Sequence, residues 1–359
     1  MTFEDTKEGL KNYLLQALNM VLDAAETSYT NSFDISISPN GFYWLPRLPS
    51  SFIINFELYE RIFEIANIAL YPRYTLLKQN GMYIVPLDSN DIHVQRALFF
   101  PWMPGIPERL TIPNLNFEAN KNHTFPLMKN LNLDYDSVTS IAIAGTSGSG
   151  KSYFLNYLLS TIHYFSKLTV IDPKMDQPAR WARDNNVEVI YPDASRSKAD
   201  FVNEINEVLA NALHMINDRQ RRLYVNPQLQ FDHYTIAIDE VLALGEGIPK
   251  SIKNAFDSLI SQIALLGRAT KVHLLLVSQR FDFNTLPPSV REQANVLIQL
   301  GHINSKTTQF LFPDIDPKGI VIPLGKGTGL IQIIDSEHPA QVLPFLAPTY
   351  SLSKGDKNE

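Results

Sequence analysis

The octet GTSGSGKS, at residues 145–152, constrains the fold of this chain more than any other stretch. It follows the apolar run SIAIA and precedes YFLNYLLSTIHYF, in which apolar residues recur with a helical period. The octet fits G-x-x-x-x-G-K-[ST], a phosphate-binding loop that joins a strand to a helix. Its glycines let backbone N–H groups converge on phosphates, and the start of the next helix adds the positive end of its dipole. The sequence therefore predicts a nucleoside-triphosphate site.

Within this loop, two side chains have chemistry of their own. Lys151 is expected to reach the β and γ phosphates, and the Ser152 hydroxyl is expected to ligate Mg²⁺. The remaining loop residues are predicted to bind the nucleotide through their backbone: Gly145, Thr146, Ser147, Gly148, Ser149 and Gly150.

Hydrolysis needs a further pair of carboxylates, which the segment HYTIAIDE supplies at the end of a strand-like run. Asp239 is predicted to hold the magnesium ion with its water shell, and Glu240 is predicted to act as the general base for the attacking water. A glutamate base separates this site from kinases and small GTPases, in which another residue positions the nucleophile.

A third strand-like run, VHLLLVSQR, ends in Ser278 and Gln279. The carboxyl ends of parallel strands face the ligand crevice, so Gln279 is expected beside the γ phosphate, where it could sense hydrolysis. A Gln that follows a strand is otherwise usually a loop residue.

The fold class follows from the order of segments after residue 126. Short β-branched runs alternate with stretches of helical period, which predicts an α/β fold with a mostly parallel sheet covered by helices. The clearest helix is expected from about residue 200 to 223.

The first 125 residues have a different pattern. They open with a helix in which Leu10, Leu14, Leu18, Val21 and Ala25 share a face, and continue with short runs such as SFIINFEL and GMYIVPL. We interpret them as a smaller mixed α+β domain with antiparallel strands, for docking or as a tier of a ring. The proline-rich stretch 101–125 is the expected connection to an ATPase domain at 126–350, and 351–359 is expected to be a disordered tail.

Composition excludes several other classes of site. The chain has 359 residues and no cysteine, which excludes disulfides, thiolate nucleophiles and cysteine-ligated zinc. Its eight histidines show no HExxH or paired spacing, so no strong signal for another metal site is found. The formal net charge is -6, so contact with a polyanion has to be local. Apolar runs are strand-sized rather than the roughly 20 residues of a membrane span, so a cytoplasmic protein is expected.

Six ordered segments resemble the motor domain of the FtsK/SpoIIIE family of DNA translocases: GTSGSGKS, TVIDPK, ALHMINDRQRRL, AIDE, LLGRATKVHLLLVSQR and GKGTGLIQI. The resemblance is nearest to the short, coupling-protein-like ATPases of conjugative elements in Gram-positive bacteria. It implies a RecA-like P-loop ATPase that uses ATP and Mg²⁺, assembles into a ring, expected to be a hexamer, and moves double-stranded DNA through its centre.

The resemblance also implies roles for individual residues. Lys151 and Ser152 match the nucleotide-binding motif, Asp239 and Glu240 match the magnesium and catalytic positions, and Gln279 matches the polar sensor of the TQR motif. Arg268, in GRATKVH, matches the arginine that is the best candidate for insertion into the neighbouring subunit's site, where a guanidinium can stabilise charge on the γ phosphate. The alternative for Arg268 is a surface salt bridge.

Other matched positions receive weaker interpretations. The residues of the DPK motif, 172–174, match a position near the subunit boundary, and we assign them no catalytic role. Three cations flank the loop and helix where such translocases place pore-facing elements, although each is alternatively a solvated surface charge: Arg280, Arg291 and Lys306.

Three functional hypotheses follow. The first is an ATP-driven translocase of double-stranded DNA, of the coupling type used in conjugation or plasmid mobilisation. A relaxase or conjugation channel components would be its partners, and membrane recruitment would come from partners without direct insertion. The second is a related ring ATPase of the HerA-like, packaging or secretion type. The third is an ATP-dependent assembly or partner-binding module, against which the presence of Glu240 and Arg268 argues.

Overall fold

The computed structural model describes residues 6–22, 32–47, 54–90, 95–113, 123–282, 285–335 and 341–351. The chain divides into two compact units, each described by itself below. The first comprises Met1–Pro107, Asp314–Ile322 and Ala340–Pro344, and the second comprises the rest. Residues 108–125, which the composition grouped with the N-terminal part, thus lie in the second unit. Of the expected tail, all but Ser351 lies outside the described residues.

An antiparallel sheet and two helices make up the first unit. Strand β6 is central, because β2, β3 and β5 all pair with it and β1 pairs with β2. The elements are α1 (Lys7–Leu22), β1 (Phe33–Ser38), β2 (Gly41–Pro46), α2 (Phe56–Leu70), β3 (Tyr74–Leu76), β4 (Lys78–Gln79), β5 (Ile84–Pro86) and β6 (Arg96–Pro104). Part of the expected proline-rich connection, PWMP, therefore lies within a strand.

The end of the run SFIINFEL is the start of helix α2, whereas the sequence predicts a strand there. The side chain of Asn55 accepts a hydrogen bond from the N–H of Leu58, and this N-cap starts the helix at Phe56. From there, buried residues recur with a helical period through Ile62 and Ala66. The N-cap at Asn55 and the helical spacing of the buried residues together outweigh the strand propensity of the preceding isoleucines.

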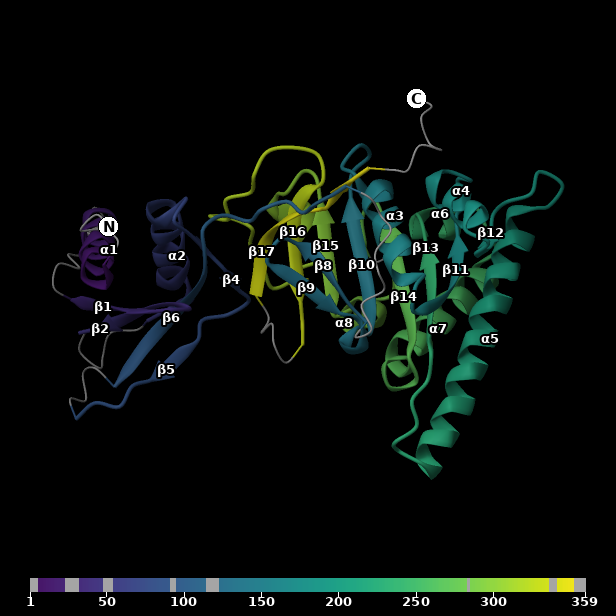
Figure 1. The fold of residues 1–359 in the computed structure, drawn as a ribbon, viewed down its shortest axis with the longest axis horizontal. Coiled ribbons are helices and arrows are strands. Elements are labelled where there is room, and N and C mark those ends of the chain that lie inside the picture. Colours follow the sequence, from purple (N-terminus) through teal and green to yellow (C-terminus); the bar gives the residue numbers. More distant parts are fainter. Residues whose placement is uncertain are drawn as a thin grey trace. The chain divides into compact units, whose positions relative to one another are not determined.

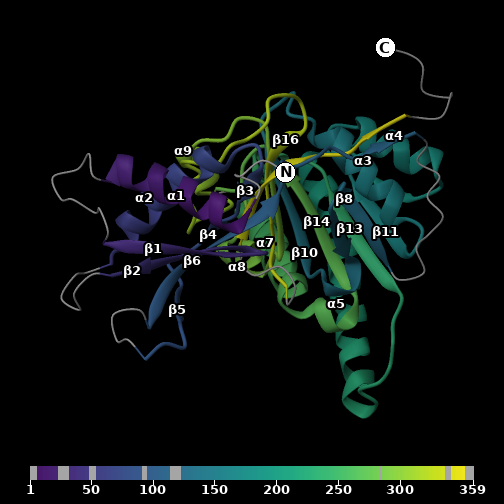
Figure 2. The same ribbon diagram turned by 60° about the vertical axis from the view of Figure 1, so that its left-hand side comes forward.

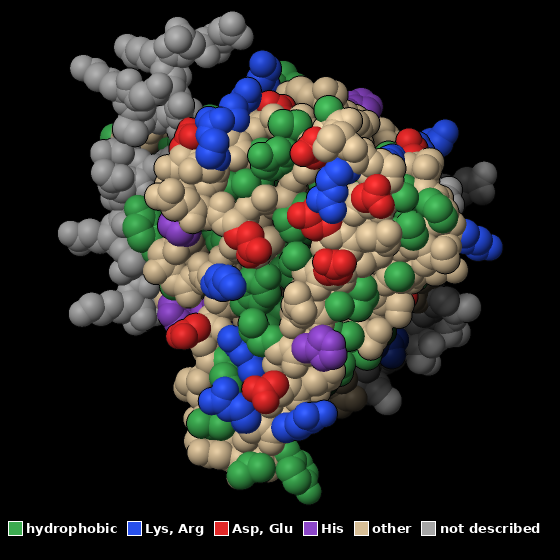
Figure 3. Space-filling model, turned by 90° about the vertical axis from the view of Figure 1, so that its right-hand side faces the viewer, with side chains coloured by type: hydrophobic (Ala, Val, Ile, Leu, Met, Phe, Trp, Pro, Cys, Tyr) green, Lys and Arg blue, Asp and Glu red, His purple; other side chains and the backbone are tan. Residues whose placement is uncertain are grey.

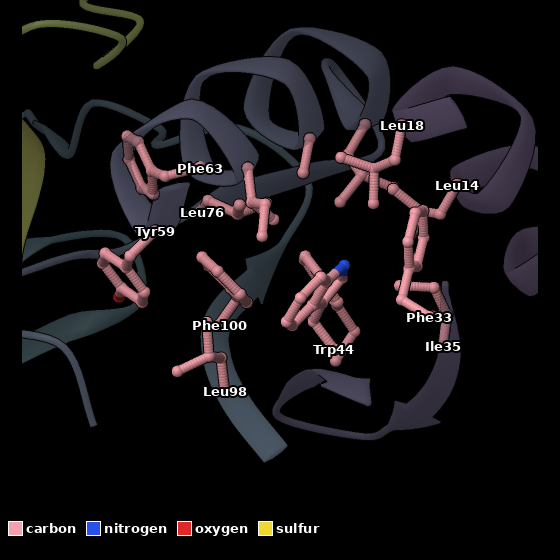
Figure 4. Close-up of a cluster of buried hydrophobic side chains, with 14 of the residues drawn as sticks. Leu14, Leu18, Phe33, Ile35, Trp44, Tyr59, Phe63, Leu76, Leu98 and Phe100 are labelled. Atoms are coloured by element: carbon pink, nitrogen blue, oxygen red, sulfur yellow. The ribbon is translucent and has the colours of Figure 1, made fainter. Parts of the chain in front are cut away.

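The core of the first unit lies between its two helices and its sheet (Figure 4). Leu10, Leu14 and Leu18 of α1 are buried in it as expected, but the fourth buried position is Leu22, whereas Val21 is exposed. Ala25 lies outside the described residues. Trp44 of β2 is fully buried and stacks on Phe33, with ring centroids 5.5 Å apart. Burial of aromatic and aliphatic side chains of this size is the main stabilising term for a small unit.

The second unit contains the predicted parallel sheet, in the order β12-β11-β13-β14-β10-β15-β16 (Figure 1). All neighbours are parallel except β16, which is antiparallel to β15. The strands are β10 (Ser140–Gly145), β11 (Ser166–Ile171), β12 (Glu188–Ile190), β13 (His233–Ile238), β14 (Val272–Ser278), β15 (Val296–Leu300) and β16 (Thr328–Ile333). Every residue of β10, β13, β14 and β15 is buried, which is typical of a sheet covered on both faces.

Two groups of helices cover this sheet. Because parallel crossovers are right-handed, the direction of each crossover decides the face on which its helix lies. Helices α3 and α4 lead from β10 outward to β12 and contact each other, while α5, α7 and α8 lead back to β15 and form the other contacting group. The helices are α3 (Lys151–Ile162), α4 (Gln177–Asp184), α5 (Lys198–Val225), α6 (Val241–Gly245), α7 (Lys250–Leu266), α8 (Pro288–Gln293) and α9 (Ser305–Thr308).

Smaller elements complete the second unit. Two strands form a hairpin, β8 (Thr124–Met128) with β9 (Leu131–Asp134), which is followed by a 3₁₀ turn, η3 (Tyr135–Ser137). A second 3₁₀ turn, η4 (Arg268–Thr270), precedes β14, and β7 (Thr111–Ile112) pairs with β18 (Thr349–Tyr350). Strand β17 (Gln341–Leu346) begins in the first unit, where it pairs with β4, and ends in the second.

Helix α5 is the predicted helix of residues 200–223, extended at both ends. Ser197 and Asp200 form a reciprocal capping box at its start. Its C-terminal end extends beyond the strands of the second unit in two views (Figures 1 and 2). There Tyr224 is 91% exposed and Val225 is 83% exposed.

Candidate active site

The phosphate-binding loop connects β10 to α3, as the sequence predicts. Two of its glycines are required by the backbone. Gly150 has φ of 99°, in the left-handed region that residues with a Cβ rarely adopt. A Cβ on Gly145 would lie 2.6 Å from the carbonyl oxygen of Leu300 on the neighbouring strand. The loop is thus held close against the sheet, with α3 starting at Lys151.

Lys151 folds back onto this loop. Its Nζ atom donates hydrogen bonds to the carbonyl oxygens of Gly145 and Thr146, the second at 3.2 Å. Burial lowers the pKa of Lys151, while the charges of Glu240 and Asp239 act in the opposite direction. The ammonium group therefore lies within the electrostatic influence of the two carboxylates expected at the phosphate site.

Asp239 lies directly after β13, at the carboxyl edge of the sheet, and is buried. Burial, together with the nearby charge of Asp172, raises its pKa to about 6. Asp172 follows the adjacent strand β11 and is also buried, where its carboxylate accepts hydrogen bonds from backbone N–H groups of Lys174, Asp176 and Ala179. Asp172 thus fixes the turn that leads into α4.

Glu240 is the most heavily hydrogen-bonded carboxylate of the site. Its Oε1 atom accepts from the backbone N–H of Gln279 at 3.0 Å and from the hydroxyl of Ser278 at 3.2 Å. Its Oε2 atom accepts from Lys174 Nζ at 2.5 Å and from Gln279 Nε2 at 3.4 Å. Burial alone would raise the pKa of Glu240, but the hydrogen bonds from Lys174 and the Gln279 backbone lower it overall. The carboxylate is therefore held in its ionised form.

Lys174 is the residue at this site that sequence reasoning missed. It was matched to a motif near the subunit boundary and given no catalytic role, yet its ammonium group contacts Glu240. The contact depends on the pairing of β11 with β13, which brings the ends of these strands together. The available signal is a cation three residues after the end of β11, near Asp172.

A cavity of about 500 Å³ connects these groups. Its volume lies within the range of about 300–1,000 Å³ that is usual for cofactor sites. The predicted site residues that line it are Ser147, Gly148, Gly150, Lys151, Ser152, Asp239, Glu240 and Gln279. The further lining residues include Arg109, whose guanidinium donates to the carbonyl oxygens of Lys326 and Ala347, and Tyr153.

Four predicted residues do not line the cavity: Gly145, Thr146, Ser149 and Arg268. The first three belong to the loop itself. Arg268 lies in η4, before the start of β14, whereas Gln279 follows the end of that strand. Arg268 is thus exposed at the opposite edge of the sheet and does not reach the cavity of its own chain.

The three candidate DNA-contacting cations differ from one another. Arg280 is exposed and forms an ion pair with Asp282, with 2.7 Å between Nε and Oδ2. Arg291 donates to the carbonyl oxygen of Phe310 at 2.8 Å and is partly buried, so it supports the local structure. Lys306 is exposed on α9. On the face shown in Figure 3, basic and acidic side chains are interspersed.

Among the described helices, none combines the length and apolar character that crossing a membrane requires.

Comparison with protein families finds no family model that matches the chain. Curated relatives are found. The chain is 24% identical over 237 residues to the FtsK domain-containing protein YdcQ of Bacillus subtilis, which covers 64% of this chain and 47% of the relative. It is 27% identical over 217 residues to the DNA translocase SftA of the same organism, which covers 56% of this chain and 22% of the relative. The chain spans less than half the length of these relatives.

Among solved structures, the conjugation coupling protein TcpA of pCW3, in a monomer form with ATPγS, aligns over 95% of each chain with a TM-score of 0.58. The sequence identity is 16%, so this likeness establishes the fold. Together with the parallel sheet and the phosphate-binding loop, it confirms the expected RecA-like P-loop architecture. The curated relatives of this chain thus include an FtsK domain-containing protein and DNA translocases, and its fold is similar to that of a conjugation coupling protein.

Proposed function

We propose that this chain is an ATP-driven motor that moves double-stranded DNA, of the coupling type that serves conjugation or plasmid mobilisation. The observation that carries the proposal is the cavity in which a phosphate-binding loop, Asp239, Glu240 and Gln279 face one another. Some of the curated relatives, SftA among them, are named as DNA translocases, and the structural neighbour is named as a conjugation coupling protein.

The residues of the cavity fit Mg²⁺ together with ATP. Mg²⁺ prefers oxygen ligands, and the Ser152 hydroxyl and the Asp239 carboxylate both line the cavity. Buried Asp239 has a pKa of about 6, so a divalent cation beside it would favour the ionised form. When bound, the ion would neutralise charge on the phosphates.

The chain's own residues supply the remaining chemistry. Lys151 offers an ammonium group to the phosphates, and the N-terminus of α3 offers backbone N–H groups. Glu240, held ionised by its donors, accepts a proton from the attacking water. Gln279 contacts both oxygens of Glu240 through its backbone and side-chain nitrogens, so it couples the base to the end of β14.

A ring explains the position of Arg268. In its own chain this arginine is exposed and remote from the cavity, which suits a group that acts on a neighbouring subunit. We propose a ring, with six subunits as the expected number, in which Arg268 completes the site of the next copy. Binding to a relaxase or to conjugation channel components would provide recruitment to the membrane.

Steady-state ATP hydrolysis with Mg²⁺ tests the proposal in the absence and presence of long duplex DNA or single-stranded DNA. Wild type is compared with Glu240→Gln and with Glu246→Gln, a control that changes an exposed glutamate at the end of α6. We expect duplex DNA to stimulate wild type and Glu246→Gln severalfold, and Glu240→Gln to lose turnover by roughly 10²-fold or more. Turnover that ignores DNA would contradict the translocase proposal and favour an assembly or partner-gated ATPase.

Movement requires a separate measurement, because hydrolysis can depend on DNA without translocation. A third strand annealed to a duplex is displaced only by a motor that travels along that duplex. We expect ATP-dependent displacement by wild type and none by Glu240→Gln. Stimulated hydrolysis without displacement would contradict movement while leaving the ATPase assignment intact.

A further inference from the structure

Two histidines and an aspartate converge in the second unit, away from the cavity described above. The Nε2 atom of His233 lies 3.3 Å from Nδ1 of His123 and 3.2 Å from Oδ1 of Asp136. Nδ1 of His123 lies 3.1 Å from Oδ2 of Asp136. His233 is buried, while His123 and Asp136 are more accessible, with side chains 36% and 44% exposed. The three side chains thus form a closed triangle of contacts, in which Asp136 uses both carboxylate oxygens and two of the three side chains are accessible to solvent.

Topology alone brings these residues together. His233 is the first residue of β13, Asp136 lies in η3, and His123 immediately precedes β8. The start of β13 is the opposite end of that strand from Asp239 and Glu240. The cluster is therefore not part of the nucleotide cavity, and it has no role in the function proposed above.

Protons cannot satisfy all three contacts of the triangle. The ammonium of Lys271 lies 2.6 Å from Asp136 Oδ1, which keeps the carboxylate ionised, so it can only accept hydrogen bonds. If both imidazoles donate to Asp136, the contact between His123 and His233 joins two donors. If either nitrogen is instead unprotonated, its lone pair faces the carboxylate. Every assignment leaves one contact between like groups, whereas a cation at the centre attracts both nitrogens and the carboxylate.

The spacing also suits a metal ion. Metal–nitrogen and metal–oxygen bonds of about 2.0–2.2 Å to Zn²⁺ in tetrahedral geometry place neighbouring ligand atoms about 3.3–3.6 Å apart. The two contacts of His233, at 3.3 and 3.2 Å, and the contact of His123 with the other carboxylate oxygen, at 3.1 Å, are close to these edges. Two imidazoles and one carboxylate form a ligand set that Zn²⁺ uses with water in the fourth position.

An outer partner supports His233 in this role. Its second ring nitrogen, Nδ1, lies 2.8 Å from Nε2 of His273, which is fully buried on the adjacent strand β14. When the other ring nitrogen of a ligating histidine donates a hydrogen bond, the ring is fixed and the lone pair of Nε2 is directed at the ion. Burial of both rings between strands gives His233 a fixed orientation.

We propose that His123, Asp136 and His233 bind one divalent transition-metal ion, for which Zn²⁺ is the best match. The ion would join the segment before β8 and the turn η3 to the start of β13. In its absence, Lys271 provides the cation that balances Asp136. Metal and ammonium therefore compete for the same carboxylate.

Zn²⁺ binding to the full chain, with any affinity tag removed, tests this proposal by calorimetry and by competition with a chromophoric chelator. We expect one ion per chain and a rise in melting temperature when Zn²⁺ is added. His123→Gln and Asp136→Asn should each lower the affinity at least about tenfold, the smallest loss typical even of outer-shell changes. His214→Gln, which removes an exposed histidine on α5, should bind like wild type.

Two further measurements separate a metal ligand from a purely structural residue. Co²⁺ in place of Zn²⁺ should give the visible absorption of a tetrahedral site in wild type and lose it in His123→Gln. Lys271→Met should bind Zn²⁺ more tightly, because the competing ammonium is removed; unchanged or weaker binding would contradict Asp136 as a ligand. Failure of wild type to bind, or equal binding by folded His123→Gln and Asp136→Asn, would overturn the proposal.

Discussion

The Nζ atom of Lys174 lies 2.5 Å from Oε2 of Glu240 and joins the turn after β11 to the proposed catalytic base after β13. The pair is asymmetric, because the lysine side chain is 46% exposed and that of Glu240 only 5%. An ammonium group in this position occupies an oxygen that a general base needs for water. It can leave toward solvent more readily than the carboxylate can move.

Lys174→Met tests whether this pair restrains hydrolysis. Removing the ammonium takes away a hydrogen bond and a charge that lower the pKa of Glu240, so the carboxylate becomes more basic and accessible. We expect severalfold faster hydrolysis without DNA and a smaller ratio of stimulated to basal turnover. Lys250→Met, at an exposed position of α7, serves as the control. Unchanged basal turnover combined with weaker ATP binding would instead assign Lys174 to the phosphates.

Asp239→Asn should stabilise the nucleotide-free protein near neutral pH while abolishing turnover. The pKa of Asp239 is raised from 3.8 to about 6, mainly by burial, so the folded state binds a proton more tightly than the unfolded state. Stability is therefore lost as pH rises between these values, by about 3 kcal/mol for two pKa units. The variant lacks this charge, so its melting temperature should be a few degrees higher.

The pH dependence provides the check on Asp239→Asn. Thermal melts of both proteins without Mg²⁺ should differ most above about pH 7 and converge toward pH 4, where Asp239 is protonated in the folded state and about half protonated in the unfolded state. If Asp239→Asn raised the melting temperature equally at both pH values, the removal of a buried charge would not be the cause of the increase.

Lys151→Ala should remove the effect of nucleotide on stability. A ligand that binds only the folded state at 100 times its Kd stabilises that state by about 2.7 kcal/mol. We expect ATP with Mg²⁺ to raise the melting temperature of wild type and of the control Lys250→Ala, but not that of Lys151→Ala. Equal shifts in all three proteins would exclude a phosphate contact by Lys151.

Arg268→Ala should impair neighbouring subunits rather than its own site. In a ring, each variant subunit inactivates the site of the next copy, so a mixture with wild type should lose turnover out of proportion to the variant fraction. ATP hydrolysis is measured across a series of mixing ratios and plotted against the fraction of variant subunits. A strictly linear loss would indicate that Arg268 acts within its own chain or only on the surface, as an ion pair would.

Local patterns predicted the second unit well, because its strands and phosphate loop are encoded by contiguous residues. The run SIAIAG is β10, and GTSGSGKS begins α3 at Lys151. The same reasoning failed for SFIINFEL, where the cap at Asn55 decided for a helix. Contacts between residues that are distant in the sequence could not be predicted, because they depend on which strands are neighbours in the sheet. Lys174 and Glu240 are 66 positions apart, and His123 and His233 are 110 positions apart.

The backbone at Glu240 has one more consequence. Its φ of 55° and ψ of 65° place it in the left-handed region, which costs a residue with a side chain about 1–2 kcal/mol. Glycine would remove that cost but also the carboxylate, so thermal stability and turnover should respond in opposite directions at this one position. In this backbone conformation the carboxylate accepts a hydrogen bond from the N–H of Gln279. Part of the free energy of folding therefore offsets the backbone strain that orients the base.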